Sequence, residues 1–222
     1  MTVILIRHGR STANTSGVLA GRTPGVALDD VGRAQADDLV TRLGGVEIVA
    51  AVRSPLLRCE QTLAPLLSAR ALDATVDDRL AEVDYGSWTG RKIGELLNEP
   101  LWKVVQQQPS AAEFPGGEAL AQVQARAVAA VRAHDRAVTA EFGPDAVWVA
   151  CSHGDVIKAI VADAVGSHLD QFQRIVVNPA STSVVTYGEH RPVVHWVNNS
   201  TGPAVLPKRK PEEATVGGER GV

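Results

Sequence analysis

The sequence predicts a three-layer α/β fold, in which helices flank both faces of a mostly parallel sheet. Three short apolar runs, 3–6, 46–52 and 147–150, are rich in β-branched residues and are typical of strands buried on both faces. Segments with helical spacing alternate with them, which favours parallel strands joined by right-handed crossovers. At 222 residues, the chain is long enough for one compact domain with a small cap.

The helices follow from the spacing of apolar residues. Four stretches have this spacing: 29–43, a segment that begins at 54 and kinks or ends near 65, 118–141, and 155–165. The second should begin with Ser54 as N-cap and Pro55 in the first turn, because serine accepts an unpaired N–H and proline has none to lose. Late in the chain, 182–187 and 193–197 read as a pair of strands joined by a short loop.

Two segments depart from this pattern. Residues 88–117 contain three prolines and a run of glutamines, which predicts an irregular cap over the sheet edge, where substrate selectivity would lie. The catalytic domain is therefore expected over 1–199. The rest, 200–222, is a Pro, Gly and charged tail with too few large apolar residues to order itself.

Charge and hydropathy exclude several classes of protein. The net charge is −3, the pI is near 6.1, and no long run of Lys and Arg occurs, which argues against binding to nucleic acid or a membrane surface. No apolar run approaches the roughly 20 residues of a membrane helix, and the first apolar run is too short for a signal peptide. A soluble, cytoplasmic protein is expected.

Metal and disulfide sites are not supported by the cysteines and histidines. Cys59 and Cys151 lack the spacing of a zinc or disulfide motif, so they are expected to be small buried apolar residues. Four histidines have no partners at metal-ligand spacing and are expected on the surface or in packing: His134, His168, His190 and His195. We expect no metal and no organic cofactor.

Polar groups follow the three predicted strands. Arg7-His8-Gly9 closes the first, Arg58 lies in the helix after the second, and His153-Gly154 closes the third. Ligand sites in open α/β sheets form beyond the carboxyl ends of the strands, so these groups should meet there. Two imidazoles and two guanidiniums, with N–H donors from helix N-termini, would suit a dianionic phosphoryl group.

Four segments in this order also resemble a known family. They are Arg7–Asn14, Ser54–Thr62, Leu80–Gly90 and Ser152–Ile157, and together they resemble the histidine phosphatase superfamily, in its phosphoglycerate mutase-like branch. The resemblance extends over about residues 1–190. Arg-His-Gly alone would be weak, but four ordered segments are far more specific.

The resemblance implies roles for these residues. His8 would be the nucleophile that forms a phosphohistidine, and Glu82 would be the general acid and base. Arg7, Arg58 and His153 would hold the phosphoryl oxygens in the transition state. The substrate side would be lined by Ser11, Asn14, Gly21, Arg22 and Gly154.

Some of these roles have alternatives in the sequence. Asp78 and Asp84 lie near Glu82 and could supply the acid, and Asn14 could simply hold its loop. Gly116-Gly117 could cradle a phosphate, although a simple entry into the next helix fits better.

The segment after Glu82 separates the possible reactions. The glycolytic mutases of the family have Arg-His-Tyr-Gly after this glutamate, whereas this chain has Val83-Asp84-Tyr85-Gly86. Each lost charge-assisted contact to a second phosphate is worth on the order of 1.5–3 kcal/mol. The sequence therefore favours a metal-independent phosphatase acting on a small phosphorylated metabolite. A phosphomutase and a non-catalytic phospholigand-binding protein stay open as alternatives, and a homodimer is plausible.

Overall fold

A mixed six-stranded sheet forms the centre of the computed structural model, which describes residues 1–188 and 190–201. The strand order is β3-β2-β4-β1-β5-β6. Strands β1 to β4 run parallel to one another, β5 runs antiparallel to β1, and β6 runs antiparallel to β5. The strands are β1 (Thr2–Arg7), β2 (Ile48–Arg53), β3 (Ala74–Val76), β4 (Val147–Ser152), β5 (Thr182–Tyr187) and β6 (Pro192–Asn199). The prediction of a mostly parallel sheet is confirmed.

Helices form around each predicted helical stretch. The α-helices are α1 (Thr12–Ser16), α2 (Asp30–Arg42), α3 (Leu57–Arg70), α4 (Ile93–Leu96), α5 (Pro100–Gln107), α6 (Leu120–Phe142) and α7 (Gly154–Ala164). Four short 3-10 helices complete the described elements: η1 (Asp78–Leu80), η2 (Gly86–Trp88), η3 (Pro109–Ala111) and η4 (Leu169–Arg174). The sequence anticipated α2, α3, α6 and α7, and it missed the five-residue helix α1.

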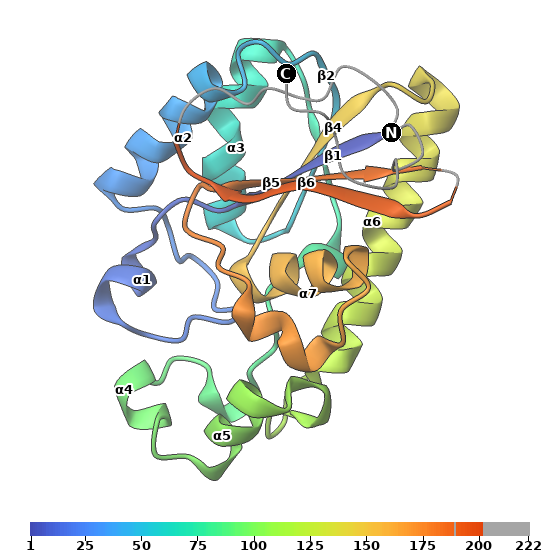
Figure 1. The fold of residues 1–222 in the computed structure, drawn as a ribbon. Helices are drawn as coiled ribbons and strands as arrows, with labels where there is room; N and C mark the ends of the chain where they lie inside the picture. The colour runs from blue at the N-terminus through green and yellow to red at the C-terminus, as the bar shows by residue number, and fades with distance from the viewer. Residues whose placement is uncertain (189, 202–222) are drawn as a thin grey trace.

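The helices form the two outer layers. Figure 1 shows α2 and α3 on one side of the sheet and α6 and α7 on the other. Side chains of β1 alternate between the two layers: Ile4 and Ile6 join the core beneath α2 and α3, whereas Val3 and Leu5 join the core beneath α6 and α7. All four are at most 1% exposed. The strand is therefore buried on both faces, as its continuous apolar run predicted.

The start of α3 differs from the prediction. The helix begins at Leu57 with Leu56 as N-cap, so Ser54 and Pro55 precede it. The Ser54 hydroxyl is 2.7 Å from a ring nitrogen of His153, and it also accepts from the Leu56 amide at 3.4 Å. Pro65 lies inside α3 and does not end it. The sequence also missed β3, because three residues at a sheet edge, two of them exposed, leave no apolar run.

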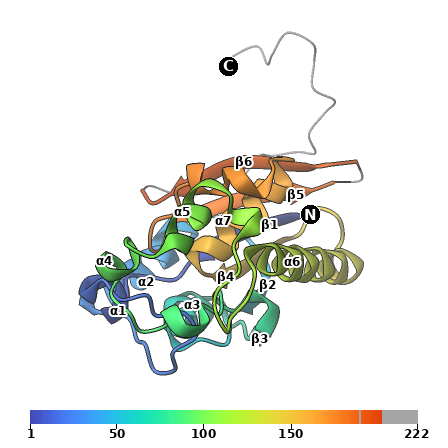
Figure 2. The ribbon, with the colours of Figure 1, turned by 90° about the horizontal axis from the view of Figure 1, so that it is seen from below.

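The stretch 88–117 is a short helical excursion that carries α4, α5 and η3. Its inner side packs around aromatic rings, with the centroids of Trp88 and Trp102 6.2 Å apart and Phe114 edge-on to Trp88. Figure 2 shows α4 next to α1. A backbone hydrogen bond of 2.9 Å from Ile93 to the carbonyl of Gly17 joins the excursion to the turn after α1.

Three further expectations concern the tail, membrane-spanning helices and the two cysteines. Of the tail predicted over 200–222, residues 202–222 lie outside the described residues. Within the part that is described, no helix is both long enough and apolar enough to cross a membrane. Cys59 and Cys151 are buried free thiols, as predicted.

Candidate active site

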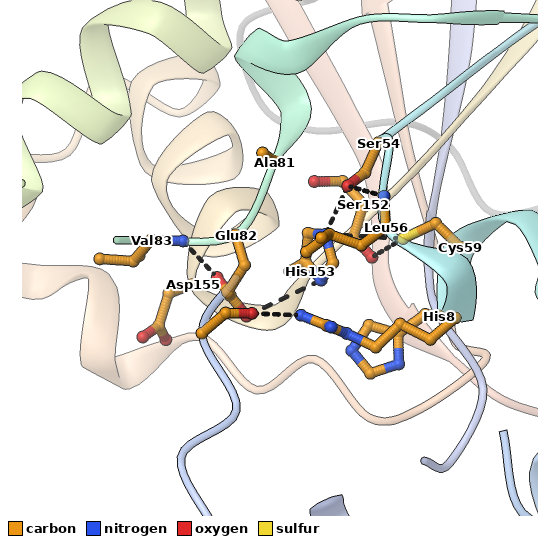
Figure 3. Close-up of polar contacts among 12 residues, drawn as sticks. His8, Ser54, Leu56, Cys59, Ala81, Glu82, Val83, Ser152, His153 and Asp155 are labelled. Carbon is orange, nitrogen blue, oxygen red and sulfur yellow. Dashed lines mark hydrogen bonds and ion pairs between the residues drawn. The ribbon is translucent and has the colours of Figure 1, made fainter. Parts of the chain in front are cut away.

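The carboxyl ends of β1, β2 and β4 bring the predicted site together. Because β4 lies between β1 and β2, Arg7 pairs with Ser152 on one side and Arg53 with Cys151 on the other. The chain continues this pairing one residue further, where the His8 amide donates to the Ser152 carbonyl at 3.0 Å. His8 and His153 therefore emerge side by side, and the loop that carries Glu82 faces them (Figure 3).

His8 is held in one tautomer by its neighbour. Its Nδ1 lies 2.7 Å from the Gly9 carbonyl oxygen. Because a carbonyl only accepts, Nδ1 must donate, which leaves the Nε2 lone pair free. Burial, followed by the charges of Arg58 and Arg7, lowers the pKa of His8 well below its ordinary value. The ring is therefore neutral at physiological pH, with an unprotonated Nε2.

A close backbone approach fixes the loop that follows His8. A Cβ atom added at Gly9 would lie 2.7 Å from the Gly32 carbonyl oxygen, and one added at Gly32 would lie 2.0 Å from the Arg10 carbonyl oxygen. Only glycine fits at both positions. The Gly9 amide also donates to Thr62 Oγ1 at 2.9 Å, which ties the loop to α3.

His153 faces both His8 and Glu82. Its ring centroid is 5.2 Å from that of His8, and its Nδ1 is 3.9 Å from Glu82 Oε2. Nε2 lies 2.7 Å from Ser54 Oγ, whereas Nδ1 is buried and has no hydrogen-bond partner among the described residues. Burial, followed by the charges of Arg58, His8 and Arg7, lowers the pKa of His153. If Ser54 donates to Nε2, then Nδ1–H is a free donor toward the site.

Arg7 and Arg58 supply positive charge at the same place. Arg58 is 2% exposed and donates from one terminal nitrogen to the Gly21 carbonyl at 2.9 Å, and Arg7 donates to the Val177 carbonyl. The other Arg58 terminal nitrogen, Nη1, and Arg7 Nε are buried without partners in the described part of the chain. Buried unpaired donors cost free energy, and an anionic ligand between these groups would satisfy both.

Glu82 has the properties of a proton donor. Burial raises its pKa to about 7, the nearby Asp155 carboxylate adds to this, and Arg58, the Val83 amide and Arg7 act in the opposite direction. The Val83 amide donates to Glu82 Oε1 at 3.0 Å and orients the carboxyl group. A carboxyl group that titrates near neutrality can both give and take a proton.

An ion-pair network positions the backbone of Glu82. Arg22 and Arg126 both donate to the Glu82 carbonyl, at 2.8 and 3.1 Å. Glu118 accepts from both arginines and also from the Asp84 amide at 3.0 Å. The half-buried Glu118 carboxylate thus connects three segments of the chain around the loop that carries the acid.

A cavity of about 400 Å³ opens at these side chains. Its inner end is lined by Arg7, His8, Arg58 and Glu82. The part called here the outer part is lined by three segments: Val18 to Gly21, the start of α7 with Asp155 and Lys158, and residues 173 and 175 to 178. Ile93 is the part of the 88–117 excursion that lines it. Among the described residues, no three His, Cys, Asp or Glu side chains cluster as metal ligands would.

Comparison with known proteins agrees with this geometry. The family model described as histidine phosphatase superfamily (branch 1) matches residues 3–200. The chain belongs to this superfamily. The predicted resemblance and the phosphoglycerate mutase-like fold are therefore confirmed.

Relatives of this superfamily member include phosphatases and a mutase. It is 30% identical over 202 residues to phosphoserine phosphatase 1 of Hydrogenobacter thermophilus, covering 88% of this chain and 91% of the relative. It is 34% identical to a 2,3-bisphosphoglycerate-dependent phosphoglycerate mutase of Thermoplasma acidophilum, over 43% of this chain and 48% of the relative. A mycobacterial glucosyl-3-phosphoglycerate phosphatase, solved with VO3, superposes with a TM-score of 0.81 at 25% identity, covering 89% and 98% of the two chains.

The structure of this superfamily member places most of the predicted site residues at the cavity. Ser11, Asn14, Gly21 and Gly154 all line it. Asn14 also accepts from the Ser11 amide and hydroxyl, at 3.0 and 2.9 Å, so it holds its loop as well. Arg22 is not among the lining residues and instead holds the Glu82 backbone.

The alternative acids and the glycine pair lie elsewhere. Asp78 and Asp84 are not among the lining residues, and Asp84 accepts from the Gly86 amide in a turn. Gly117 packs its backbone against Asp84, so Gly116-Gly117 forms a close contact between segments rather than a lining of the cavity.

Several contributors to the site gave no clear signal in the sequence. The role of Ser54 was hidden because Ser-Pro is also a helix-start pattern. Glu118 contacts Asp84 and Arg22, 34 and 96 positions away, and Arg126 contacts the Glu82 carbonyl, 44 positions away; no local motif reveals these pairs. Residues 173 to 178 carry no motif; their place just before β5, the antiparallel neighbour of β1, is the one feature that could have located them.

Proposed function

We propose that this protein is a phosphatase that hydrolyses a small phosphomonoester through a phosphohistidine on His8. The observation that carries the proposal is the neutral His8 ring, with Nδ1 bound to Gly9 and Nε2 free, close to Arg7 and Arg58, each of which has a buried N–H group without a partner among the described residues. A neutral nucleophile in a cationic pocket suits attack on a phosphate dianion.

The first step transfers the phosphoryl group to the enzyme. The Nε2 lone pair of His8 forms a bond to phosphorus while the bond from phosphorus to the alcohol oxygen breaks. Glu82, protonated below its pKa of about 7, gives its proton to that oxygen, and the alcohol leaves neutral.

The second step returns the enzyme to its starting state. The Glu82 carboxylate takes a proton from water while the water oxygen bonds to phosphorus. The bond between phosphorus and His8 Nε2 then breaks, which releases inorganic phosphate and the neutral imidazole. Arg7, Arg58 and the Nδ1–H of His153 stabilise the charge on the three other oxygens in both steps. The protein supplies this positive charge itself, so the proposal needs no metal.

A phosphomutase is the second candidate, because one of the matched relatives is a mutase. A mutase must retain a doubly phosphorylated intermediate, and here Val83 and Asp84 replace the two cationic residues that follow the glutamate in the glycolytic enzymes. Neither Val83 nor Asp84 lines the cavity, so this segment supplies no cation to hold a second phosphate. An assay with and without a catalytic amount of bisphosphorylated substrate separates the two: transfer that needs priming and outpaces phosphate release would favour the mutase.

The phosphoenzyme is the direct test of the mechanism. Protein quenched during turnover of a phosphomonoester should carry acid-labile, base-stable phosphate on His8, and His8→Ala should carry none. His168→Ala is the control, because that imidazole is 68% exposed and lies outside the cavity. Equal hydrolysis by the wild type and His8→Ala would rule out the proposed nucleophile.

A further inference from the structure

We propose that the outer part of the cavity binds an apolar group of the substrate, so that the preferred substrates are phosphomonoesters of alcohols with an apolar body. This inference rests on the proposed function, since it assigns the alcohol side of the same site. The residues concerned, called here the apolar rim, are Val18, Leu19, Ile93, Ile175 and Val176.

Exposure of the rim is the first observation. Ile93 is 40% exposed and Val176 is 59% exposed, although both line a cavity whose inner end is built for an anion. Large apolar side chains gathered in the open at the mouth of a cavity are typical of ligand sites. Binding phosphate alone would need none of them.

One wall of the rim is built before any ligand binds. The segment Gly17–Leu19 pairs with 90–93 through backbone hydrogen bonds from Leu19 to Arg91, from Gly90 to Leu19 and from Ile93 to Gly17, at 2.8 to 2.9 Å. An isolated β-bridge also joins Val18 and Lys92. These bonds hold Val18, Leu19 and Ile93 on one surface. The backbone here therefore loses little conformational freedom when a ligand binds.

The other wall is connected to the phosphate end. The Val177 carbonyl accepts from Arg7, and the Asn178 amide donates to Asn198 Oδ1 at 2.6 Å. Ile175 and Val176 directly precede these anchored residues. The position of this wall is therefore set relative to the guanidinium that would hold the phosphoryl group.

The charged side chains in the outer part are already paired within the protein. Lys158 Nζ lies 3.2 Å from Asp155 Oδ1 and 3.1 Å from Gln173 Oε1, and the Tyr85 hydroxyl donates to Asp155 Oδ2 at 2.9 Å. Among the described lining residues, the outer part thus offers no unpaired charge to a carboxylate or an ammonium group. An apolar alcohol fits this lining better than a charged one.

Two substrates with similar primary-alcohol leaving groups test the proposal. Wild type should hydrolyse 3-phenylpropyl phosphate with a kcat/KM roughly tenfold or more above that for glycerol 3-phosphate. Val176→Ser and Ile93→Ser should each reduce this preference roughly fivefold, mainly by raising KM for the phenylpropyl ester. Their kcat/KM for glycerol 3-phosphate should fall less than that for the phenylpropyl ester, because the short polar alcohol makes less apolar contact with the rim.

Matched controls separate the rim from general effects of removing surface apolar groups. Val165→Ser and Val31→Ser alter side chains that are 56% and 43% exposed and lie outside the cavity, so they should leave the preference unchanged. Equal kcat/KM for the two esters in the wild type would overturn the proposal. So would an unchanged preference in both rim variants.

A binding measurement keeps this inference separate from the proposed function. In the His8→Ala background, 3-phenylpropyl phosphate should bind more tightly than glycerol 3-phosphate, and Val176→Ser should remove most of the difference. If the binding preference holds while wild type forms no phosphohistidine, the proposed mechanism is wrong and the proposal for the rim is supported. If phosphohistidine forms but neither binding nor turnover favours the phenylpropyl ester, the rim proposal fails alone.

Discussion

The imidazole rings of His8 and His153 lie 5.2 Å apart, centroid to centroid, at an interplanar angle of 60°. Two charged imidazoles at this distance would repel each other. Burial is the largest cause that lowers the pKa of each ring, and the guanidinium of Arg58 is the next. Both rings are therefore neutral over the physiological range, as the proposed mechanism requires of His8 as nucleophile and His153 as hydrogen-bond donor.

The pH dependence of turnover should report Glu82. Its pKa is about 7, and the first step needs the protonated form, so kcat/KM should fall as pH rises through about 7. Glu82→Gln should lose about 10²- to 10⁴-fold in kcat for an alkyl phosphate and should no longer show this fall. Steady-state kinetics from pH 5 to 9 measure both effects. An unchanged profile in Glu82→Gln would remove this residue as the proton donor.

Asp155 offers a second check on the same titration. Its carboxylate raises the pKa of Glu82, so Asp155→Asn should lower that pKa and move the fall in kcat/KM to lower pH. Tyr85→Phe is the control, because it removes the hydroxyl bonded to Asp155 but leaves the charge. A shift of equal size in Tyr85→Phe would show that packing, not charge, controls the titration.

Glu82 should also link stability to pH. The pKa of this group rises from 4.5 to about 7 in the folded protein, so its favourable contribution is complete below about pH 4.5 and is lost as pH rises through 7. Across that range the loss is on the order of 3 kcal/mol. Glu82→Gln removes the ionisable group, so its Tm relative to wild type should be higher at pH 8 than at pH 5. A difference that is constant with pH would contradict a raised pKa of Glu82 in the folded protein.

Much of the fold could be predicted because strands and helices have local signatures. The apolar run at 3–6 is continuous, and its burial on both faces follows directly. The site was predictable where each residue follows a strand, as His8 and His153 do. What could not be predicted depends on contacts distant in sequence, such as the Arg126 bond to the Glu82 carbonyl, 44 positions away.

Ser54 shows how a local pattern can point to the wrong partner. Ser-Pro is compatible with the start of a helix, yet the hydroxyl lies 2.7 Å from Nε2 of a histidine 99 positions later. The contact with His153 depends on the pairing of β2 with β4. Helix propensity at residues 54 and 55 alone therefore could not predict it.

The same hydroxyl supports a prediction about His153. Ser54→Ala should lower kcat roughly tenfold with a smaller change in KM, because the ring loses the bond that holds its tautomer and orientation. Ser152→Ala is the control: this buried hydroxyl donates to the Leu80 carbonyl at 2.7 Å and does not contact the ring. Its substitution should cost about 1–2 kcal/mol of stability with little change in kcat. Equal kcat values for Ser54→Ala and wild type would show that the bond is not needed.

Gly86 should be required to place the loop that carries Glu82. Its φ is +50°, and an added Cβ would lie 2.2 Å from the Pro115 carbonyl oxygen and 2.6 Å from the Gly117 nitrogen. Gly86→Ala must therefore separate the 82–86 loop from 115–117, and Glu82 would move with it. We expect a loss of more than about 2 kcal/mol in the free energy of unfolding, measured by urea denaturation, together with reduced kcat.

Gly116→Ala is the matched control for this clash. Gly116 also has a positive φ, of +70°, but an added Cβ would meet nothing within 4 Å. It should therefore cost only the backbone strain of a non-glycine residue, about 1–2 kcal/mol, and kcat should be preserved. If both variants lose the same stability and the same activity, positive φ alone explains the effect. In that case, close packing of 86 against 115–117 does not position the acid.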